Sequence, residues 1–206
     1  MQNIQMPDWD ISYTPTLYQD FMERMDHHVE LLIQNKGKSK ICLLEYEEVY
    51  TTGESDNRSV IGNIPLIQTN RGGTITYHGP GQRIIYPILN LNNYKLDLHW
   101  YLNTLEQWII GALKNFDIEA EQNATQRGVW VKGAGKIASI GIRMRKWIVF
   151  HGCAVNIETN MNKFKSIRPC GIDPYLMTSC SKLGKDVSIK EFDQVLQNSF
   201  DTYFCM

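Results

Sequence analysis

The sequence predicts an α+β domain in which helices cover a mixed, largely antiparallel sheet. Three observations point to it. Apolar residues recur at helical spacing near the start, the middle and the end of the chain, and short strand-like runs fill the stretches between them. The third observation is that no repeat, low-complexity segment or linker divides the chain. We therefore expect residues 1–206 to form a single domain.

Three segments have the helical period, and each has a recognisable start. Thr14-Pro15 is a typical first turn, with a capping hydroxyl before a proline, and this predicted helix runs until Gly37. Asp97 is the expected cap of a second helix. Ser188 and Glu191 form a capping box for a third helix near the end of the chain.

Strands are predicted between these helices, from short apolar runs bounded by turn residues. The runs are KICLLEYEEVYTTGE (40–54), RIIYPILNL (83–91), GVWV (128–131), KIASIGIRM (136–144) and WIVFHGCAVNI (147–157). The nearly continuous apolar run 83–91 is typical of a buried strand. The last two runs are joined by the turn 143–146, which favours an antiparallel hairpin.

Composition and charge exclude several classes of protein. The net charge is −1, from 21 Lys and Arg against 22 Asp and Glu, so no overall basic field indicates nucleic-acid binding. No apolar run is long enough to span a membrane, and the N-terminus does not have the pattern of a secretory signal. The five cysteines lack a C-x-x-C spacing, which argues against disulfides or a zinc site and favours the reducing cytoplasm.

The stretch RGGTITYHGPGQ (71–82) combines glycine-rich turns with a short strand-like alternation. The glycines let backbone amides approach a ligand that side chains would otherwise block. The stretch matches neither a Walker phosphate loop nor a dinucleotide fingerprint. Two turns around an edge strand, with Tyr77 packed and His78 satisfied by neighbours, explain the pattern equally well.

Two further stretches place small residues beside groups that carry chemistry. In GAGKIASIGIR (133–143), small residues follow Lys136 and leave room for a ligand near its ammonium group. The alternative is a solvated lysine at the entrance of a strand, where most lysines lie. In FHGCAVNI (150–157), Gly152 removes a side chain from the surface of a predicted strand.

The fourth stretch, FKSIRPCGI (164–172), holds a cysteine in a loop setting. Cys170 lies between Pro169 and Gly171, which favours a positioned thiol over a packed one, whereas Cys42 and Cys153 lie in predicted strands and are interpreted as core residues. A nearby ammonium group lowers the pKa of a thiol, so a lysine and a cysteine together suit acyl transfer. The spacing alone does not pair Cys170 with a particular lysine.

The four stretches, in this order, resemble the lipoyl(octanoyl) transferases, over residues 40 to 180 or so. That family carries R-G-G-x-x-T-Y-H-G-P-G-Q, a G-x-K-I-A-x-I-G strand, an H-G-x-A-x-N strand and a P-C-G loop. The resemblance implies the fold of the biotin/lipoate protein ligase catalytic domain. It also implies transfer of octanoyl from octanoyl-acyl carrier protein to a lysine ε-amine, through a thioester on the cysteine.

The resemblance also implies roles for individual residues. Cys170 is the expected nucleophile, and Lys136 is the expected group that lowers the thiol pKa and transfers protons. The expected substrate-binding residues lie in three motifs: Arg71, Gly72, Gly73, Thr74, Ile75, Thr76, Tyr77, His78, Ser139, Ile140, Gly141, Gly152, Cys153 and Ala154. No metal and no cofactor are implied.

The partners implied by the resemblance are proteins. The donor is octanoyl-acyl carrier protein, and the acceptors are lipoyl domains of 2-oxoacid dehydrogenase E2 subunits and the glycine cleavage H protein. We expect a cytoplasmic monomer that binds neither nucleic acid nor membrane. The basic turn 143–146 is interpreted as a solvated turn, with a nucleic-acid patch or a docking point for the acidic carrier as alternatives.

Two other functions remain open. An ATP-dependent lipoate– or biotin–protein ligase has a similar fold but needs no nucleophilic cysteine, so the P-C-G loop argues against it. A non-catalytic module that binds an acyl carrier or a lipoyl domain would not need both Lys136 and Cys170.

Overall fold

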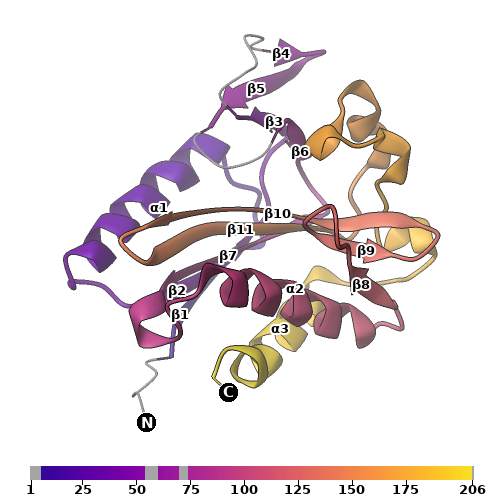
Figure 1. The fold of residues 1–206 in the computed structure, drawn as a ribbon. Helices are drawn as coiled ribbons and strands as arrows, with labels where there is room; N and C mark the ends of the chain where they lie inside the picture. The colour runs from indigo at the N-terminus through magenta and orange to yellow at the C-terminus, as the bar shows by residue number, and fades with distance from the viewer. Residues whose placement is uncertain (1–5, 54–59, 70–73, 206) are drawn as a thin grey trace.

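The computed structural model describes residues 6–53, 60–69 and 74–205, and of Val60 and Cys170 the backbone only. Three α-helices lie in this part of the chain: α1 (Tyr18–Ile33), α2 (Leu98–Lys114) and α3 (Ile189–Phe204). Helix α1 lies on one side of a large sheet, and α2 and α3 lie on the other (Figure 1). No helix in these residues is long and apolar enough to cross a membrane.

Among the described residues the larger sheet has seven strands, in the order β1-β2-β7-β11-β10-β9-β8. The strands are β1 (Asp8–Ile11), β2 (Lys40–Leu44), β7 (Gln82–Asn90), β11 (Ile148–Asn156), β10 (Gly135–Arg145), β9 (Val129–Val131) and β8 (Ala120–Gln122). Only β1 and β2 pair in parallel, and the other neighbours are antiparallel. The predicted mixed, largely antiparallel sheet is therefore confirmed.

A smaller sheet lies above the upper end of α1 in Figure 1 and has the strand order β4-β5-β3-β6. Its strands are β3 (Val49–Thr52), β4 (Val60–Ile61), β5 (Ile64–Gln68) and β6 (Thr76–His78). Short 3₁₀ helices fill the connections: η1 (Leu91–Asn93), η2 (Met161–Ser166), η3 (Pro169–Gly171), η4 (Pro174–Leu176) and η5 (Ser181–Leu183). Strand β6 contacts both η2 and η3, which brings the first motif against the fourth.

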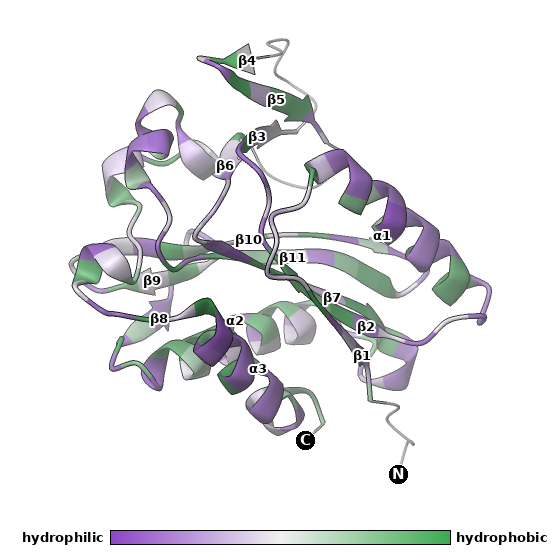
Figure 2. Cartoon of the chain, turned by 180° about the vertical axis from the view of Figure 1, so that it is seen from behind, coloured by the Kyte–Doolittle hydropathy of each residue, from purple (hydrophilic) through white to green (hydrophobic). Residues whose placement is uncertain are grey.

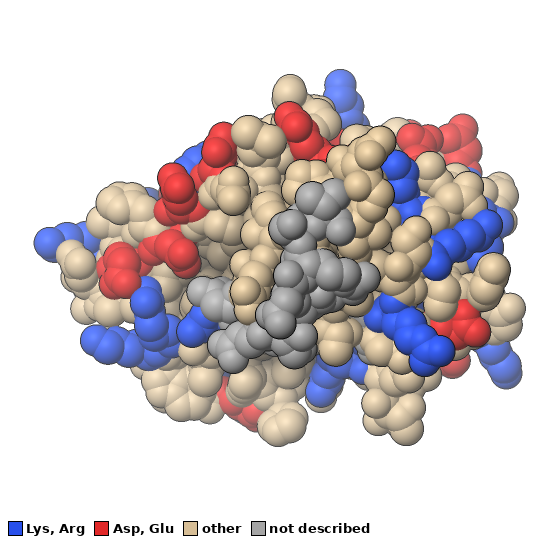
Figure 3. Space-filling view, turned by 90° about the horizontal axis from the view of Figure 1, so that it is seen from above, with Lys and Arg blue, Asp and Glu red and all other residues tan. Residues whose placement is uncertain are grey.

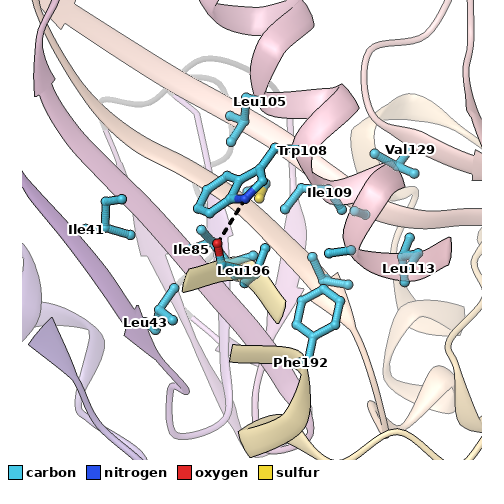
Figure 4. Packing of buried hydrophobic residues seen from close by; sticks show 14 of the residues in the cluster. Ile41, Leu43, Ile85, Leu105, Trp108, Ile109, Leu113, Val129, Phe192 and Leu196 are labelled. Atoms are coloured by element: carbon cyan, nitrogen blue, oxygen red, sulfur yellow. Dashed lines mark hydrogen bonds between the residues drawn. The ribbon is translucent and has the colours of Figure 1, made fainter. Parts of the chain in front are cut away.

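The two faces of the larger sheet are covered by separate apolar clusters, because alternate residues of each strand point to opposite faces. Ile41 and Leu43 of β2 pack towards α2 and α3, and Cys42 and Leu44 pack towards α1. The indole of Trp108 is fully buried in the first cluster and donates to the Leu196 carbonyl at 3.2 Å (Figure 4). The outward faces of α1 and α3 are largely hydrophilic (Figure 2).

Most local predictions are confirmed. The Asp97 carboxylate accepts the amides of His99 and Trp100 at the start of α2, and the Ser188 hydroxyl accepts the amide of Glu191 at the start of α3. Run 83–91 is the buried strand β7. Strands β10 and β11 form the predicted hairpin, with Lys146 and Trp147 at positive φ in the turn.

Two predicted boundaries are wrong. Helix α1 begins at Tyr18 rather than at Thr14, because the Thr16 amide donates to the Glu45 carbonyl and holds this segment extended beside the end of β2. The run 40–54 is two strands in different sheets. Its middle residue Tyr46 bridges to Thr16 and is completely buried, so the chain turns from one sheet to the other there.

Candidate active site

A chain of hydrogen bonds joins three of the motifs to the segment that follows the fourth. His78 Nδ1 lies 2.7 Å from Gln82 Oε1, and Gln82 Nε2 donates to Asn156 Oδ1 at 2.9 Å. Asn156 Nδ2 then donates to the Thr178 carbonyl at 2.9 Å, and the Thr178 amide donates to the Lys136 carbonyl at 3.0 Å. Side chains and backbone far apart in the sequence thus form one buried polar path.

Lys136 is a buried lysine rather than a solvated one. Only 2% of the residue is exposed, and its Nζ lies 5.8 Å from the centre of the Trp130 ring. The pairing of β10 with β9 shifts register between Lys136 and Ala138, a bulge that redirects side chains, and Lys136 also bridges to Met177. Among the described residues, no carboxylate forms an ion pair with its ammonium group.

The loop that borders Lys136 is held by a buried carboxylate on α2. Glu106, 2% exposed, accepts the amide of Gly128 at 2.9 Å and the side chains of Gln122 at 2.7 Å and Arg127 at 3.1 Å. Gly128 in turn lies against Lys136. Glu106 therefore fixes the backbone that shapes the space around the lysine.

The cysteine of the fourth motif lies in the 3₁₀ helix η3 rather than in an open loop. Pro169 begins this helix and is buried, and Gly171 leaves it with a φ of +77°. Helix η3 contacts β6. Further along the chain, η4 contacts β10, and Met177 forms a β-bridge with Lys136. The backbone of Cys170 is therefore in a segment whose two ends are held by motif strands.

The expected substrate-binding residues of β10 and β11 are direct neighbours. Ser139 pairs with Ala154, and their strand neighbours Ile140 and Gly141 pair with Cys153 and Gly152 respectively. A Cβ on Gly152 would lie 2.1 Å from the carbonyl oxygen of Ile85, so only glycine lets β11 pack this closely on β7.

The expected substrate-binding residues of the first motif are described from Thr74 onward, and Arg71, Gly72 and Gly73 lie outside the described residues. Thr74 is exposed, whereas Ile75, Thr76, Tyr77 and His78 are buried. The Tyr77 hydroxyl donates to Glu48 Oε1 at 2.8 Å, and its ring packs edge-on against Phe164. Tyr77 is thus part of a packed cluster.

Comparison with known proteins places this geometry in a family. Residues 18–201 match the lipoyl protein ligase A/B catalytic domain. The octanoyltransferase of Rickettsia rickettsii (strain Sheila Smith) is 44% identical over 197 residues, which cover 91% of this chain and 94% of the relative. That of Rickettsia canadensis (strain McKiel) is 43% identical and is 95% covered. The chain belongs to the octanoyltransferase family. It is therefore an acyltransferase, as the four motifs predict.

Solved structures show the same fold at low sequence identity. The bi-partite lipoate protein ligase of Thermoplasma acidophilum has a TM-score of 0.72 at 14% identity, with 96% of this chain and 84% of that one covered. A biotin protein ligase from Aquifex aeolicus has a TM-score of 0.55 at 13% identity, with 97% and 69% covered. The expected likeness to the biotin/lipoate protein ligase catalytic domain is confirmed.

The other cysteines of this octanoyltransferase-family protein are poorly suited to nucleophilic attack. Burial raises the pKa of Cys42 and Cys180 to about 12 and also raises the pKa of Cys153. The pKa of the half-buried Cys205 is raised too, mainly by desolvation. The interpretation of Cys42 and Cys153 as core residues is confirmed, since they are 3% and 2% exposed.

Several residues of the site have no role that the sequence predicts. Gln82 and Asn156 are the last residues of two motifs, and each joins its motif to another strand. The signal for Glu106 is a single carboxylate within the apolar face of a predicted helix, beside Leu105 and Trp108. Among the described residues, no group of three or more His, Cys, Asp and Glu could hold a metal ion.

Proposed function

We propose that this protein transfers an octanoyl group from octanoyl-acyl carrier protein to the ε-amine of a lysine on a lipoyl domain. Cys170 carries the group as a thioester between the two steps. The proposed acceptors are lipoyl domains of 2-oxoacid dehydrogenase E2 subunits and the glycine cleavage H protein. The reaction takes place in the cytoplasm, on a monomeric enzyme that uses no cofactor.

The first step exchanges one thioester for another. The Cys170 thiolate attacks the carbonyl carbon of the donor, and the carbon–sulfur bond to the carrier breaks. The Lys136 ammonium group protonates the leaving carrier thiolate, so the free carrier thiol departs and Lys136 becomes a neutral amine.

The second step forms the amide. The neutral amine of the acceptor lysine attacks the Cys170 thioester, and the carbon–sulfur bond to the enzyme breaks. The attacking nitrogen loses a proton to the neutral Lys136 amine. The Cys170 thiolate and the Lys136 ammonium group are both restored, so the cycle consumes no nucleotide.

The observation that carries this proposal is the buried path from His78 through Gln82, Asn156 and Thr178 to Lys136. The segment that follows Cys170 is held in this path through its Thr178 amide and carbonyl. The path therefore supports a single site made of all four motifs. The raised pKa values of Cys42, Cys153 and Cys180 support Cys170 as the nucleophile.

The octanoyl group is proposed to lie against the substrate-binding residues of three motifs. The ladder of β10 and β11 between Ser139 and Ala154 supplies small and aliphatic groups, which suit a slot for an apolar chain. In the first motif, Tyr77 and His78 line the slot at the reacting end. In this arrangement Tyr77 lines the slot while its ring stays packed against Phe164. The octanoyl group must then find room beside the ring of Tyr77.

Mass spectrometry of the intact protein tests the thioester. After incubation with octanoyl-acyl carrier protein, we expect one added octanoyl mass that neutral hydroxylamine removes and that peptide mapping places on Cys170. Cys170→Ala should not acquire it, whereas Cys205→Ala, the matched control, should. An octanoyl group on Cys153 or Cys180, or one that persists in Cys170→Ala, would exclude the proposed nucleophile.

The same reaction separates this function from that of an ATP-dependent ligase. Transfer from octanoyl-acyl carrier protein to a lipoyl domain should proceed at full rate without ATP and Mg²⁺. The ligase alternative would instead require ATP with free octanoate and would give no product from the thioester.

A further inference from the structure

A groove of about 710 Å³ lies beside the proposed nucleophile segment, lined by the residue before β6, the end of η2 and the start of η4. Ile75 forms one wall, and Lys165, Arg168, Asp173 and Tyr175 form the others. Of these residues only Ile75 has a part in the function proposed above, as an expected substrate-binding residue. Its lining residue Arg168 is the N-cap of η3, two positions before Cys170.

The groove is cationic. Residues 161–168 hold three cations and no carboxylate, and of these Lys163 forms an ion pair with Glu48 at 2.6 Å. Lys165 and Arg168 are exposed, and neither forms an ion pair with any described residue. Asp173 is the one carboxylate among the described residues that line the groove, and it accepts the Tyr175 amide as the cap of η4. Figure 3 looks onto this face, and blue side chains gather on its right, where Figure 1 places η2 to η4.

An exposed apolar surface borders the same cations. Tyr175 is 72% exposed and Leu176 is 47% exposed, both in η4. Tyrosine and arginine are enriched among the residues that contribute most to protein interfaces, and exposed apolar side chains rimmed by charge mark such surfaces. The groove therefore has the composition of a docking surface for an acidic protein.

We propose that this groove binds the acyl donor as a carrier protein, with the phosphate of its phosphopantetheine arm between Lys165 and Arg168. The inference rests on the proposed function. A guanidinium and an ammonium group suit a phosphate, which the donor arm has and the acceptor lysine lacks. The acidic surface around the arm then lies beside the same two cations, and Tyr175 packs in the centre of the interface.

The basic turn 143–146 is the wrong place for this contact. It lies at the far end of β10 from Lys136 (Figure 1), and nine residues of strand span about 30 Å. Its Arg145 already pairs with Glu30 at 2.6 Å. The groove beside η3 is adjacent to the chemistry, so a docked carrier delivers its thioester to Cys170 directly.

Charge reversal tests the surface. We compare Lys165→Glu, Arg168→Glu and the double variant with Lys36→Glu, an exposed lysine beyond the far end of α1. Binding of the holo-acyl carrier protein, without an acyl group, is measured by calorimetry. We expect the double variant to bind at least tenfold more weakly and Lys36→Glu to bind like the parent.

Three octanoyl thioesters then locate the contact: those of the acyl carrier protein, phosphopantetheine and pantetheine. In the double variant, KM should rise at least tenfold for the carrier donor and severalfold for phosphopantetheine, and it should stay within twofold for pantetheine. Equal loss with all three donors, or parent binding of the carrier, would overturn the proposal. A rise in KM for the lipoyl domain alone would assign the groove to the acceptor.

These outcomes also separate this inference from the proposed function. If the parent protein binds the carrier and the variants do not, the docking surface stands even where no octanoyl is transferred. If octanoyl is transferred but the variants bind and react like the parent, the function stands and the docking surface does not.

Discussion

Gly128 lies directly against the side chain of Lys136. A Cβ on Gly128 would be 2.4 Å from Lys136 Cε and 2.6 Å from the carbonyl oxygen of Ala138, and the φ of Gly128 is +128°. No larger residue fits there unless the lysine and its strand move. The loop cannot retreat without loss of its bond to the buried Glu106 carboxylate. The position of Lys136 is therefore set by a loop and a helix, as well as by its own strand.

Gly128→Ala should lower both the rate of acyl-enzyme formation and the free energy of unfolding. The new methyl group displaces Lys136, so we expect the rate of acyl-enzyme formation to fall at least tenfold. The strained φ and the overpacking should lower the free energy of unfolding by ~1–3 kcal/mol. The matched control is Gly133→Ala, which has a φ of +72° and nothing within 4 Å of the new Cβ. It should lose stability but retain activity, and equal activity in both variants would contradict this role of Gly128.

Lys136→Met should move the reactivity of Cys170 to higher pH. Methionine retains most of the buried stem but removes the charge that favours the thiolate. The midpoint of the pH curve for iodoacetamide modification of Cys170 should shift upward, towards the ordinary pKa of a free thiol, roughly 8.5 to 9. Both half-reactions should slow, because the same group transfers both protons. The control is Lys132→Met, an exposed lysine nearby. Superimposed pH curves for the parent and Lys136→Met would exclude the pairing.

The buried thiols should resist alkylation in the native protein. With a pKa of about 12, Cys42 and Cys180 have on the order of one thiolate in 10⁴ at pH 8. Peptide mapping after brief treatment with iodoacetamide at pH 8 should therefore find Cys170 modified first. Cys42, Cys153 and Cys180 should be modified only after unfolding in urea. Early modification of Cys180 in the native protein would show that its burial is transient.

Stability should fall as the pH rises above about 9. The pKa values of the buried thiols are raised in the folded state, so the unfolded chain loses these protons first, from its ordinary pKa of 9.0. The stability contribution is complete below that value and is lost as the pH rises towards about 12 for Cys42 and Cys180. Urea unfolding at pH 8 and pH 10 should differ by about 1 kcal/mol for each buried thiol. Cys42→Ala should show a smaller difference than the parent, and an unchanged difference would assign the effect to other groups.

Asp193→Ala should lower the free energy of unfolding more than the loss of a surface carboxylate does. Arg83 and Asp193 are 0% and 1% exposed by side chain and form two bonds, at 2.8 Å and 2.6 Å. Without Asp193 a buried guanidinium loses its carboxylate, which costs about 3–5 kcal/mol. Glu30→Ala breaks the exposed pair with Arg145 and should cost about 0–1 kcal/mol. Urea unfolding at neutral pH measures both, and equal losses would contradict this ranking.

Elements whose signals are local can be predicted from the sequence alone. The caps Asp97 and Ser188, the hairpin of β10 and β11 and the buried strand β7 depend on residues within a few positions of one another. The motifs also determined the family, because a fixed order of many residues is specific before any folding is considered. Burial of Lys136 was not determined in this way, since a lysine at a strand entrance has no local pattern that buries it.

How the motifs meet depends on contacts between segments that are far apart in the sequence. Gln82 and Asn156 are 74 residues apart and bond side chain to side chain, and Glu106 on a helix holds the loop of Gly128. The division of run 40–54 into two sheets depends on Thr16 and Glu45, whose contact likewise crosses from one element to another. Hydrogen bonds between distant segments form only when the packed core brings those segments together. Local periodicity predicts which residues are buried, and the packing of the sheet against α1, α2 and α3 selects which buried polar groups become partners.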